Sequence, residues 1–423
     1  MVLSKHNFSL EQTLSILVQA LNHMDIRLTG HSERVAYSMY LLLIDSGTFS
    51  PDEIYGITIT SLFHDIGNLI YDTAQTFALR ETDNSFSHAL YGSLFLEEFS
   101  PFPQYAPLVR YHHSSAGDID ASGMERRLCW AAKCLQVVDS ADLHRIYHPV
   151  ASAEQAIDHL NLMNSRKFDI QAIEAVKLLA ECQLPKNRPI VQESVRQRLI
   201  FGLKSLQISN TMQRCLLEML IHSIDFRSHY TALHCAIVVE ISQLLARLCG
   251  LSEDDTLAVY YGAMFHDIGK IAIPKEILES PKKLHGTDWE LMQSHVLLTE
   301  EILRGKVCDE ILQIAIRHHE TLDGKGYPYK LSASELTLPQ RIVAVADIVS
   351  ALSEERSYKA AFSMDEILRI LDDLREKGKI CPVVVDVIHK NESLVYQTAK
   401  TVCLETAAKY EKIYNSYYAA MPS

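Results

Sequence analysis

Apolar residues recur along this chain at the three- and four-residue spacing of amphipathic helices. Within residues 11–24 they form one such row, made of Leu14, Leu17, Val18 and Leu21. A second row further along comprises Ile237, Ile241, Leu244, Leu245 and Leu248. No stretch combines a period of two with many β-branched residues, which is the pattern of a half-buried strand. The sequence therefore predicts an all-α protein.

Histidines and aspartates recur in the same order in the two halves of the chain. His64 and Asp65 return 202 residues later as His266 and Asp267, and the other pairs follow at displacements of up to 208 residues. The first-repeat cluster comprises His31, His64, Asp65, His88, His112, His113 and Asp139. The second-repeat cluster comprises His234, His266, Asp267, His295, His318, His319 and Asp347. A nearly constant displacement over so many positions indicates a tandem duplication.

Two prolines break the helical pattern in the middle of the chain, at Pro185 and Pro189. Proline disfavours helix in the residue before it, so a domain boundary is expected there. We predict a first domain at residues 1–185, a linker helix at 186–209 and a second domain at 210–423. Residues 191–206 should form the connecting helix, and residues 212–224 the first helix of the second domain.

Composition and charge favour a globular protein and argue against a membrane protein or a binder of long nucleic acid. Apolar residues make up 48% and charged residues 22%, which is typical of a globular protein with a sizeable core. No window approaches the roughly 18 apolar residues of a membrane span, and no leader is visible at the amino terminus. The nine cysteines are scattered without a CxxC, so we expect no disulfide framework and a cytoplasmic location. The net charge of −13 argues against binding of long nucleic acid.

Two stretches of the second repeat carry groups that bind metals. Residues 265–270, FHDIGK, end an apolar run in a His-Asp pair, and residues 318–328 read HHETLDGKGYP. The two glycines and the proline of the second stretch allow the backbone to turn the adjacent histidines toward one point. Imidazole nitrogens and carboxylate oxygens are the usual ligands of a divalent cation. The two stretches are therefore predicted to form two parts of one metal site.

Together, HDIGK at 266–270 and HHETLDGKGYP at 318–328 resemble the signature of the HD-GYP phosphodiesterases, the metal-dependent branch of the HD superfamily that hydrolyses cyclic dinucleotides. The resemblance implies two tandem HD-type helical bundles. It also implies two divalent metal ions, iron or manganese, in the second repeat. One ion would be held by His234, His266, Asp267 and Asp347. The other would be held by Asp267, His295, His318 and His319, with Asp267 bridging the two.

The same resemblance implies roles around the metals. Lys270 would act with Asp267 in catalysis, on the phosphate or on the attacking hydroxide. Arg356 and Lys359 would contact the phosphates. Tyr327 either contacts the substrate or packs the loop. As acceptors for the metal-bound imidazoles, we predict Glu320 and Asp323.

Departures from the family pattern are informative. Tyr230 stands where some members have a glutamate that binds a third metal, which favours two metals, and Ser350 stands where a second aspartate is common. In the first repeat Asn68 replaces the lysine, and Ser114 begins a stretch without a GYP motif. The first repeat keeps a possible metal-ligand set, but we expect it to be regulatory or structural.

The resulting hypothesis is an enzyme that opens a 3',5'-cyclic dinucleotide, 3'3'-cGAMP or cyclic di-GMP, to a linear 5'-phosphorylated dinucleotide. Residues 210–390 would carry this reaction, using hydroxide activated by the two metals. One alternative is a signalling scaffold that binds nucleotide or metal without turnover. Another is a nucleotide phosphohydrolase of the wider HD superfamily. No membrane association is expected, and a homodimer is left open.

Overall fold

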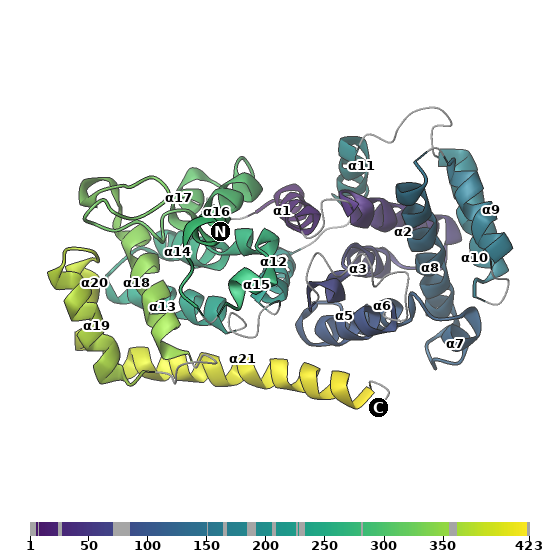
Figure 1. Cartoon of the computed structure of the whole chain (residues 1–423). Helices are drawn as coiled ribbons and strands as arrows, with labels where there is room; N and C mark the ends of the chain where they lie inside the picture. Colours follow the sequence, from purple (N-terminus) through teal and green to yellow (C-terminus); the bar gives the residue numbers. More distant parts are fainter. Residues whose placement is uncertain are drawn as a thin grey trace. The chain divides into compact units, whose positions relative to one another are not determined.

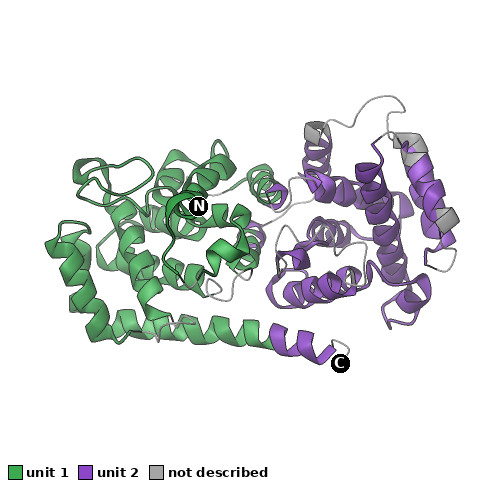
Figure 2. Cartoon of the chain, viewed as in Figure 1, with its two compact units in different colours: residues 1–20, 217–412 green, residues 21–216, 413–423 purple. Residues whose placement is uncertain are grey.

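The computed structural model describes residues 6, 8–23, 28–70, 85–149, 151–163, 167–183, 192–204, 209–225, 227, 233–280, 282–354 and 362–420. All regular elements in these ranges are helices, and the only β contact among them is an isolated bridge between Asp323 and Ser332. The predicted all-α fold is therefore confirmed. The chain divides into two compact units, residues 1–20 with 217–412 (unit 1) and residues 21–216 with 413–423 (unit 2), as Figure 2 shows.

Unit 2 contains the first repeat. Its helices, labelled in Figure 1, are α2 (His31–Ser46), α3 (Pro51–Leu62), η2 (Ile66–Ile70), α5 (Ser85–Phe99), η3 (Pro103–Tyr105), α6 (Ala106–Tyr111), α7 (Ala116–Asp120), α8 (Arg126–Tyr147), α9 (Ala153–Met163), α10 (Ile170–Gln183) and α11 (Gln192–Lys204). Helix α2 packs on α3 and α8, and α5 packs on η2 and α6.

Unit 1 contains the second repeat. Its helices are α13 (His234–Leu248), α14 (Glu253–Phe265), η4 (Ile268–Ala272), α15 (Lys275–Leu278), α16 (Gly286–Leu303), α17 (Asp309–Ala315), η5 (Ala333–Glu335), α18 (Leu338–Ser353), α19 (Met364–Glu376) and α20 (Pro382–Lys390). Helix α13 packs on α14 and α18, and α16 packs on η4. Because α2, α3 and α8 pack in the same way in the other repeat, the duplication inferred from the sequence extends to the packing of helices. Three more helices run across the division between the units, α1 (Leu10–Asn22), α12 (Asn210–Asp225) and α21 (Glu392–Ala420).

The division into units differs from the predicted domains at the amino-terminal end. Residues 1–20 belong with the second repeat, where the Phe8 ring packs edge-on against Tyr261 with the centroids 4.7 Å apart. The connecting helix predicted at 191–206 is present as α11, but it packs on α2 within unit 2. There Arg196 Nε donates to the buried Glu33 carboxylate at 2.6 Å. Helix α11 is thus part of the first bundle.

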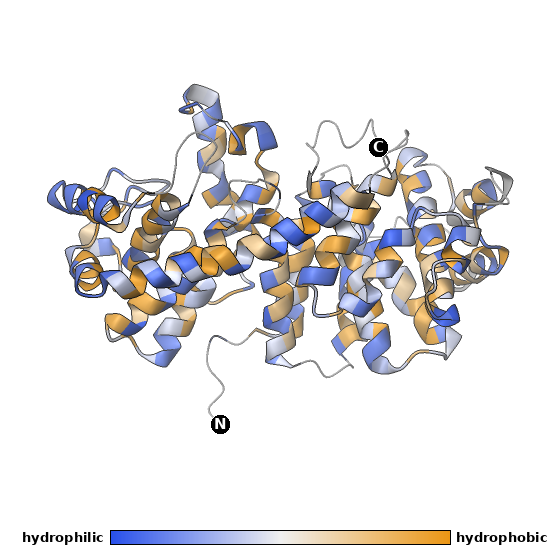
Figure 3. Cartoon of the chain, turned by 90° about the horizontal axis from the view of Figure 1, so that it is seen from below, coloured by the Kyte–Doolittle hydropathy of each residue, from blue (hydrophilic) through white to orange (hydrophobic). Residues whose placement is uncertain are grey.

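Local sequence explains where the helices that carry the clusters begin. Helix α14 starts after Ser252, whose hydroxyl accepts a hydrogen bond from the Asp255 amide at 3.1 Å. Helix α18 starts after Thr337, which forms a capping box with Gln340. Figure 3 shows apolar and polar residues distributed on different sides of many helices, as amphipathic packing requires. Among the described residues, no helix combines the length and the apolarity that crossing a membrane would need.

A glycine in each HDIG motif allows two elements to approach closely. A Cβ atom on Gly269 would lie 2.0 Å from the carbonyl oxygen of His295 in α16, and a Cβ on Gly67 would lie 2.0 Å from that of His88 in α5. Only glycine fits at such a distance. This contact brings the aspartate before each motif glycine next to the histidine of the facing helix.

We therefore expect Gly269→Ala to destabilise unit 1 by about 1–3 kcal/mol, because the added methyl group forces η4 away from α16. Thermal unfolding followed by calorimetry measures the change. Gly117→Ala is the matched control, since its Cβ would meet nothing closer than 3.8 Å. Equal unfolding temperatures for the two variants would contradict the close-approach argument.

Candidate metal centre

The residues of the second-repeat cluster come from several helices and from the turns between them. His234 begins α13, and His266 and Asp267 lie between α14 and η4. His295 lies in α16 and Asp347 in α18, while His318 and His319 lie in the turn that follows α17. His234, His266 and Asp267 offer ligand atoms that lie within 4.8 Å of one another, and so do His295, His318 and His319. The structure therefore brings the predicted ligands together as two neighbouring groups.

The imidazole tautomers of this site are set by the backbone. Nδ1 of His266, His295 and His318 each donates to the carbonyl oxygen three residues earlier, at 2.6 to 2.7 Å. A neutral imidazole that donates through Nδ1 carries its lone pair on Nε2. These Nε2 atoms lie within reach of Asp267, so their lone pairs are available to a cation beside that carboxylate.

Asp267 faces both groups at once. Its Oδ2 lies 3.2 Å from His266 Nε2 and 3.7 Å from His234 Nε2. Its Oδ1 lies 3.3 Å from His295 Nε2 and 3.9 Å from His318 Nε2. Each carboxylate oxygen thus has its own pair of imidazoles, which is the arrangement expected of a bridging carboxylate between two cations.

Asp347 also lies close to a histidine of each group. Its Oδ1 lies 3.0 Å from His234 Nε2, and its Oδ2 lies 3.8 Å from His319 Nδ1. A mixed set of imidazoles and carboxylates suits divalent iron or manganese better than a closed structural zinc site. The residues present therefore fit a pair of divalent cations.

Protonation in the site favours cation binding. Burial lowers the pKa of His295 to about 4 and the pKa of His319 to about 3, so both imidazoles are neutral at pH 7. Burial would raise the pKa of Asp267, but the His266 imidazole and the Lys270 ammonium outweigh it and hold that pKa well below its usual range. These two imidazoles thus offer neutral nitrogens and Asp267 offers charged oxygens, as metal ligands must. Burial would lower the pKa of His234, but Asp347 and Glu354 raise it to about 10, so a cation has to displace a proton from that imidazole.

Lys270 is oriented by the bridging carboxylate. Its Nζ donates to Asp267 Oδ2 at 2.5 Å. Burial lowers the pKa of Lys270, but Asp267 more than compensates, so the pKa is raised above its ordinary value and the side chain is a cation at neutral pH. A cation that cannot give up its proton readily can stabilise negative charge but cannot act as a general base.

The loop after the adjacent histidines differs in one respect from the prediction. The Glu320 carboxylate accepts hydrogen bonds from the backbone amides of Tyr329 at 2.7 Å and Leu331 at 2.9 Å. Asp323 accepts from the Thr321 hydroxyl at 2.6 Å and from the Lys325 amide at 3.2 Å. The prediction that these two carboxylates brace ligand histidines is therefore wrong, because both hold the loop backbone instead.

Tyr327 packs on the metal ligands. Its ring stacks on His319 with the centroids 4.6 Å apart and meets Trp289 edge-on at 5.9 Å. This contact limits the orientations open to the His319 imidazole. The predicted phosphate-binding residues Arg356 and Lys359, and the Tyr230 position, lie outside the described residues.

Glu354 is a residue of this site that the sequence reasoning missed. At the position after Asp347 where the first repeat has Asp142, the second repeat has Ser350, whose hydroxyl donates to Glu354 Oε1 at 2.8 Å. The same Glu354 oxygen lies 3.4 Å from His234 Nδ1, and the Ser350 hydroxyl lies closer to that nitrogen, at 3.1 Å. In the first repeat, Asp142 Oδ2 lies 2.8 Å from His31 Nδ1. Glu354, one helical turn beyond Ser350, thus replaces the missing aspartate as carboxylate partner of the first ligand histidine.

We therefore expect Glu354→Gln to weaken metal binding in the second repeat by about 10- to 100-fold, the usual cost of losing the carboxylate behind a ligand histidine. Competition with a fluorescent chelator measures the affinity. Adding Ser350→Asp to this variant should restore most of it, because the carboxylate returns to its position in the first repeat. An unchanged affinity in Glu354→Gln would show that the hydroxyl of Ser350 alone orients His234.

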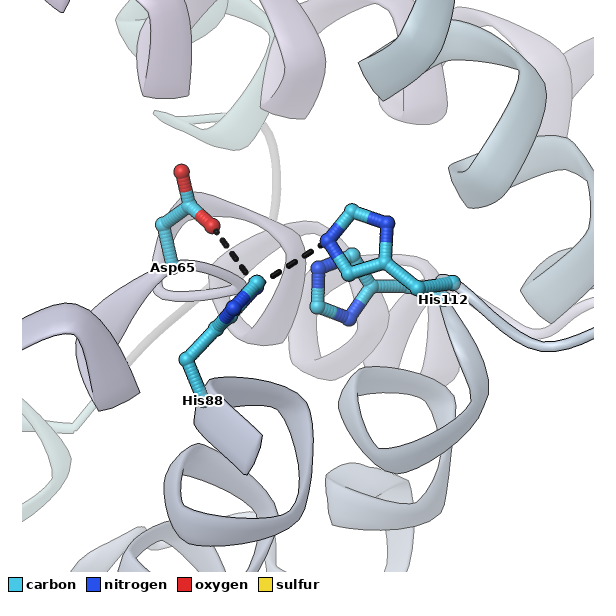
Figure 4. A group of neighbouring side chains, drawn as sticks. Asp65, His88 and His112 are labelled. Atoms are coloured by element: carbon cyan, nitrogen blue, oxygen red, sulfur yellow. Dashed lines mark hydrogen bonds and ion pairs between the residues drawn. The ribbon is translucent and has the colours of Figure 1, made fainter. Parts of the chain in front are cut away.

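The first-repeat cluster is also assembled. Asp65, His88, His112 and His113 form one group of potential ligands within 4.8 Å of one another, and His31, His64 and Asp65 form another. Figure 4 shows Asp65, His88 and His112 pointing toward a common centre. Asp139 completes the set, with its Oδ1 3.1 Å from His31 Nε2. Both repeats therefore contain clusters able to hold metal.

The sequence is similar to proteins that contain HD domains and to cyclic dinucleotide phosphodiesterases. Residues 214–383 match the family model described as HD domain. The chain is 25% identical over 414 residues to 3'3'-cGAMP-specific phosphodiesterase 1 of Vibrio cholerae, covering 92% of this chain and 94% of that protein. It is 32% identical over 242 residues to the cyclic di-GMP phosphodiesterase response regulator RpfG of Xanthomonas campestris, covering 54% of this chain and 62% of that protein.

A solved structure shows the same fold. The crystal structure of the V. cholerae cyclic GMP-AMP phosphodiesterase V-cGAP3 aligns with a TM-score of 0.55 at 20% identity, covering 92% of this chain and 98% of that one. The match extends over both repeats, beyond the HD domain model itself. Residues 214–383, which carry the ligand geometry of the second repeat, are thus an HD domain.

Proposed function

We propose that the second repeat is a phosphodiesterase that hydrolyses a 3',5'-cyclic dinucleotide. The observation that carries the proposal is the geometry of Asp267, whose two oxygens face separate pairs of imidazoles. The relatives named as 3'3'-cGAMP and cyclic di-GMP phosphodiesterases support the substrate class. Two divalent cations, iron or manganese, would supply activated water and neutralise phosphate charge in such a site.

The chain's own residues would prepare this reaction. The seven predicted ligands would hold the cations, and Tyr327, which stacks on His319, limits the movement of that ligand. Lys270 would donate a hydrogen bond to the phosphate as negative charge develops there. Water adds to phosphorus, the bond to the 3' oxygen breaks, and that oxygen leaves with a proton. The phosphate stays on the 5' oxygen, which gives a linear 5'-phosphorylated dinucleotide.

The test is a substrate panel. Protein loaded with manganese or iron is incubated with 3'3'-cGAMP, cyclic di-GMP, cyclic di-AMP and nucleoside triphosphates, and the products are identified by mass. We expect a product heavier than the cyclic dinucleotide by one water, with 3'3'-cGAMP or cyclic di-GMP as the preferred substrate. Turnover of triphosphates alone would identify a nucleotide phosphohydrolase instead. Binding of cyclic dinucleotide without any product would identify a signalling scaffold. A cytoplasmic location and a homodimer stay predictions.

A further inference from the structure

The first repeat repeats the carboxylate geometry of the second. Asp65 Oδ1 lies 3.4 Å from His88 Nε2, and Asp65 Oδ2 lies 3.7 Å from His64 Nε2 and 4.0 Å from His31 Nε2. As with Asp267, each oxygen faces its own imidazole partners (Figure 4 shows the His88 side). This geometry lies outside residues 214–383, the region matched by the HD domain model.

Two buried ring nitrogens in this cluster make no hydrogen bond within the described residues, although His64 Nε2 lies 3.4 Å from Asp139 Oδ1. His64 Nδ1 donates to the Ser61 carbonyl at 2.9 Å, and His112 Nδ1 donates to the Val109 carbonyl at 2.5 Å, so each lone pair is on Nε2. Both side chains are completely buried, and within the described residues neither Nε2 makes a hydrogen bond. Leaving a buried acceptor unsatisfied costs about 1–3 kcal/mol each, which a bound cation would recover.

One of these histidines, His31, is also held in place by a carboxylate on the far side of its ring. His31 Nδ1 contacts Asp142, whose two oxygens accept hydrogen bonds at 2.8 Å from Nε and Nη2 of Arg34. This fork fixes both the tautomer and the orientation of the His31 ring. Such an arrangement holds a metal ligand ready, and a histidine that served only as core packing would not need it.

The first repeat lacks two features of the second repeat that could contact a phosphate, the lysine and the glycine-rich loop. Asn68 occupies the position of Lys270 and carries no charge. After His113 the chain does not form a glycine-rich loop but begins α7, with Ser115 and Asp118 in a capping box. Helix α7 contains no aromatic residue, so it offers no ring to stack on His112 and His113 as Tyr327 stacks on His319.

We propose that the first repeat holds a second divalent-metal centre, formed by the first-repeat cluster, which binds metal without hydrolysing phosphodiesters. Its role is to stabilise unit 2 through α2. His31 and Glu33 share the first turn of α2, and Glu33 anchors α11 through Arg196. Metal binding at His31 thus stabilises the same turn that holds the connecting helix.

The experiment uses the full-length chain with His266→Ala and Asp267→Ala, so that metal bound in the second repeat does not contribute. After loading with Mn²⁺ and desalting, mass spectrometry of metals should still find about two ions per chain. The unfolding temperature should rise by roughly 4–8 °C with Mn²⁺, and α11 amides should exchange more slowly with deuterium. The paramagnetic resonance spectrum should show two coupled Mn²⁺ ions.

Adding His88→Ala and His112→Ala to this chain should remove the metal and the Mn²⁺-dependent shift. The matched control is His148→Ala with His159→Ala, which removes two histidines from the surface group around His144, whose ring centroids lie 4.4 and 4.3 Å away. If the double alanine variant does not fold, the isosteric Asp65→Asn takes its place. The proposal is overturned if the folded His266→Ala/Asp267→Ala chain retains no metal, or if metal is lost with the surface group. Neither result depends on whether the second repeat hydrolyses its substrate.

Discussion

Replacing Asp267 with asparagine should lower the turnover of cyclic dinucleotide by about 1000-fold or more, the scale seen when a central catalytic group is removed. The reason is geometric. The two oxygens of Asp267 face separate pairs of imidazoles, and an amide can offer only one oxygen. The variant should therefore also lose metal from the second repeat. Initial rates from product formation and metal analysis of the same preparation measure both effects.

The control for this prediction is Asp254→Asn, an exposed aspartate in the first turn of α14, which should leave turnover and metal content unchanged. A variant Asp267→Asn that keeps full activity would exclude the bimetal site as the origin of hydrolysis. The pair His266→Ala/Asp267→Ala extends the test to the other repeat. Substantial turnover in that chain would place hydrolysis in the first repeat and contradict its regulatory or structural role.

The sequence predicts which residues gather around Asp65 and Asp267, because metal ligands are restricted to a few residue types and because the duplication presents them twice. Their role as metal ligands stays a prediction. His88 and His295 show the value of the duplication, since each alone is an ordinary histidine within a helix. Their common place in two repeats indicates a shared function, and the structure puts both beside an aspartate of an HD pair. The helical fold is predicted for a similar reason, because amphipathic periodicity is a local property of the chain.

What the sequence did not predict depends on contacts between distant segments. Glu354 reaches His234 from the end of α18, and its only local signal is a position four residues after Ser350, one turn along the helix. Glu320 is predicted to brace the ligand histidines because metal-bound imidazoles need acceptors, whereas the path of the loop directs its carboxylate to the amides of Tyr329 and Leu331. The grouping of residues 1–20 with the second repeat likewise has no counterpart in the repeat pattern.

Replacing Lys270 with glutamine should lower kcat by about 100- to 1000-fold while the metal content of the second repeat stays unchanged. Asp267 raises the pKa of Lys270, so the side chain remains a cation. Losing this charge removes stabilisation from the transition state without removing a metal ligand. Lys270→Arg should recover part of kcat, since it keeps the charge. Lys275→Gln is the control, because Lys275 is a more exposed lysine of α15, and its ammonium lies 3.9 Å from Glu279. Unchanged kcat in Lys270→Gln would make Lys270 an ion-pair partner of Asp267 only. Loss of metal together with kcat would instead show that Lys270 acts by holding the bridging carboxylate in place, which the arginine variant would then also restore.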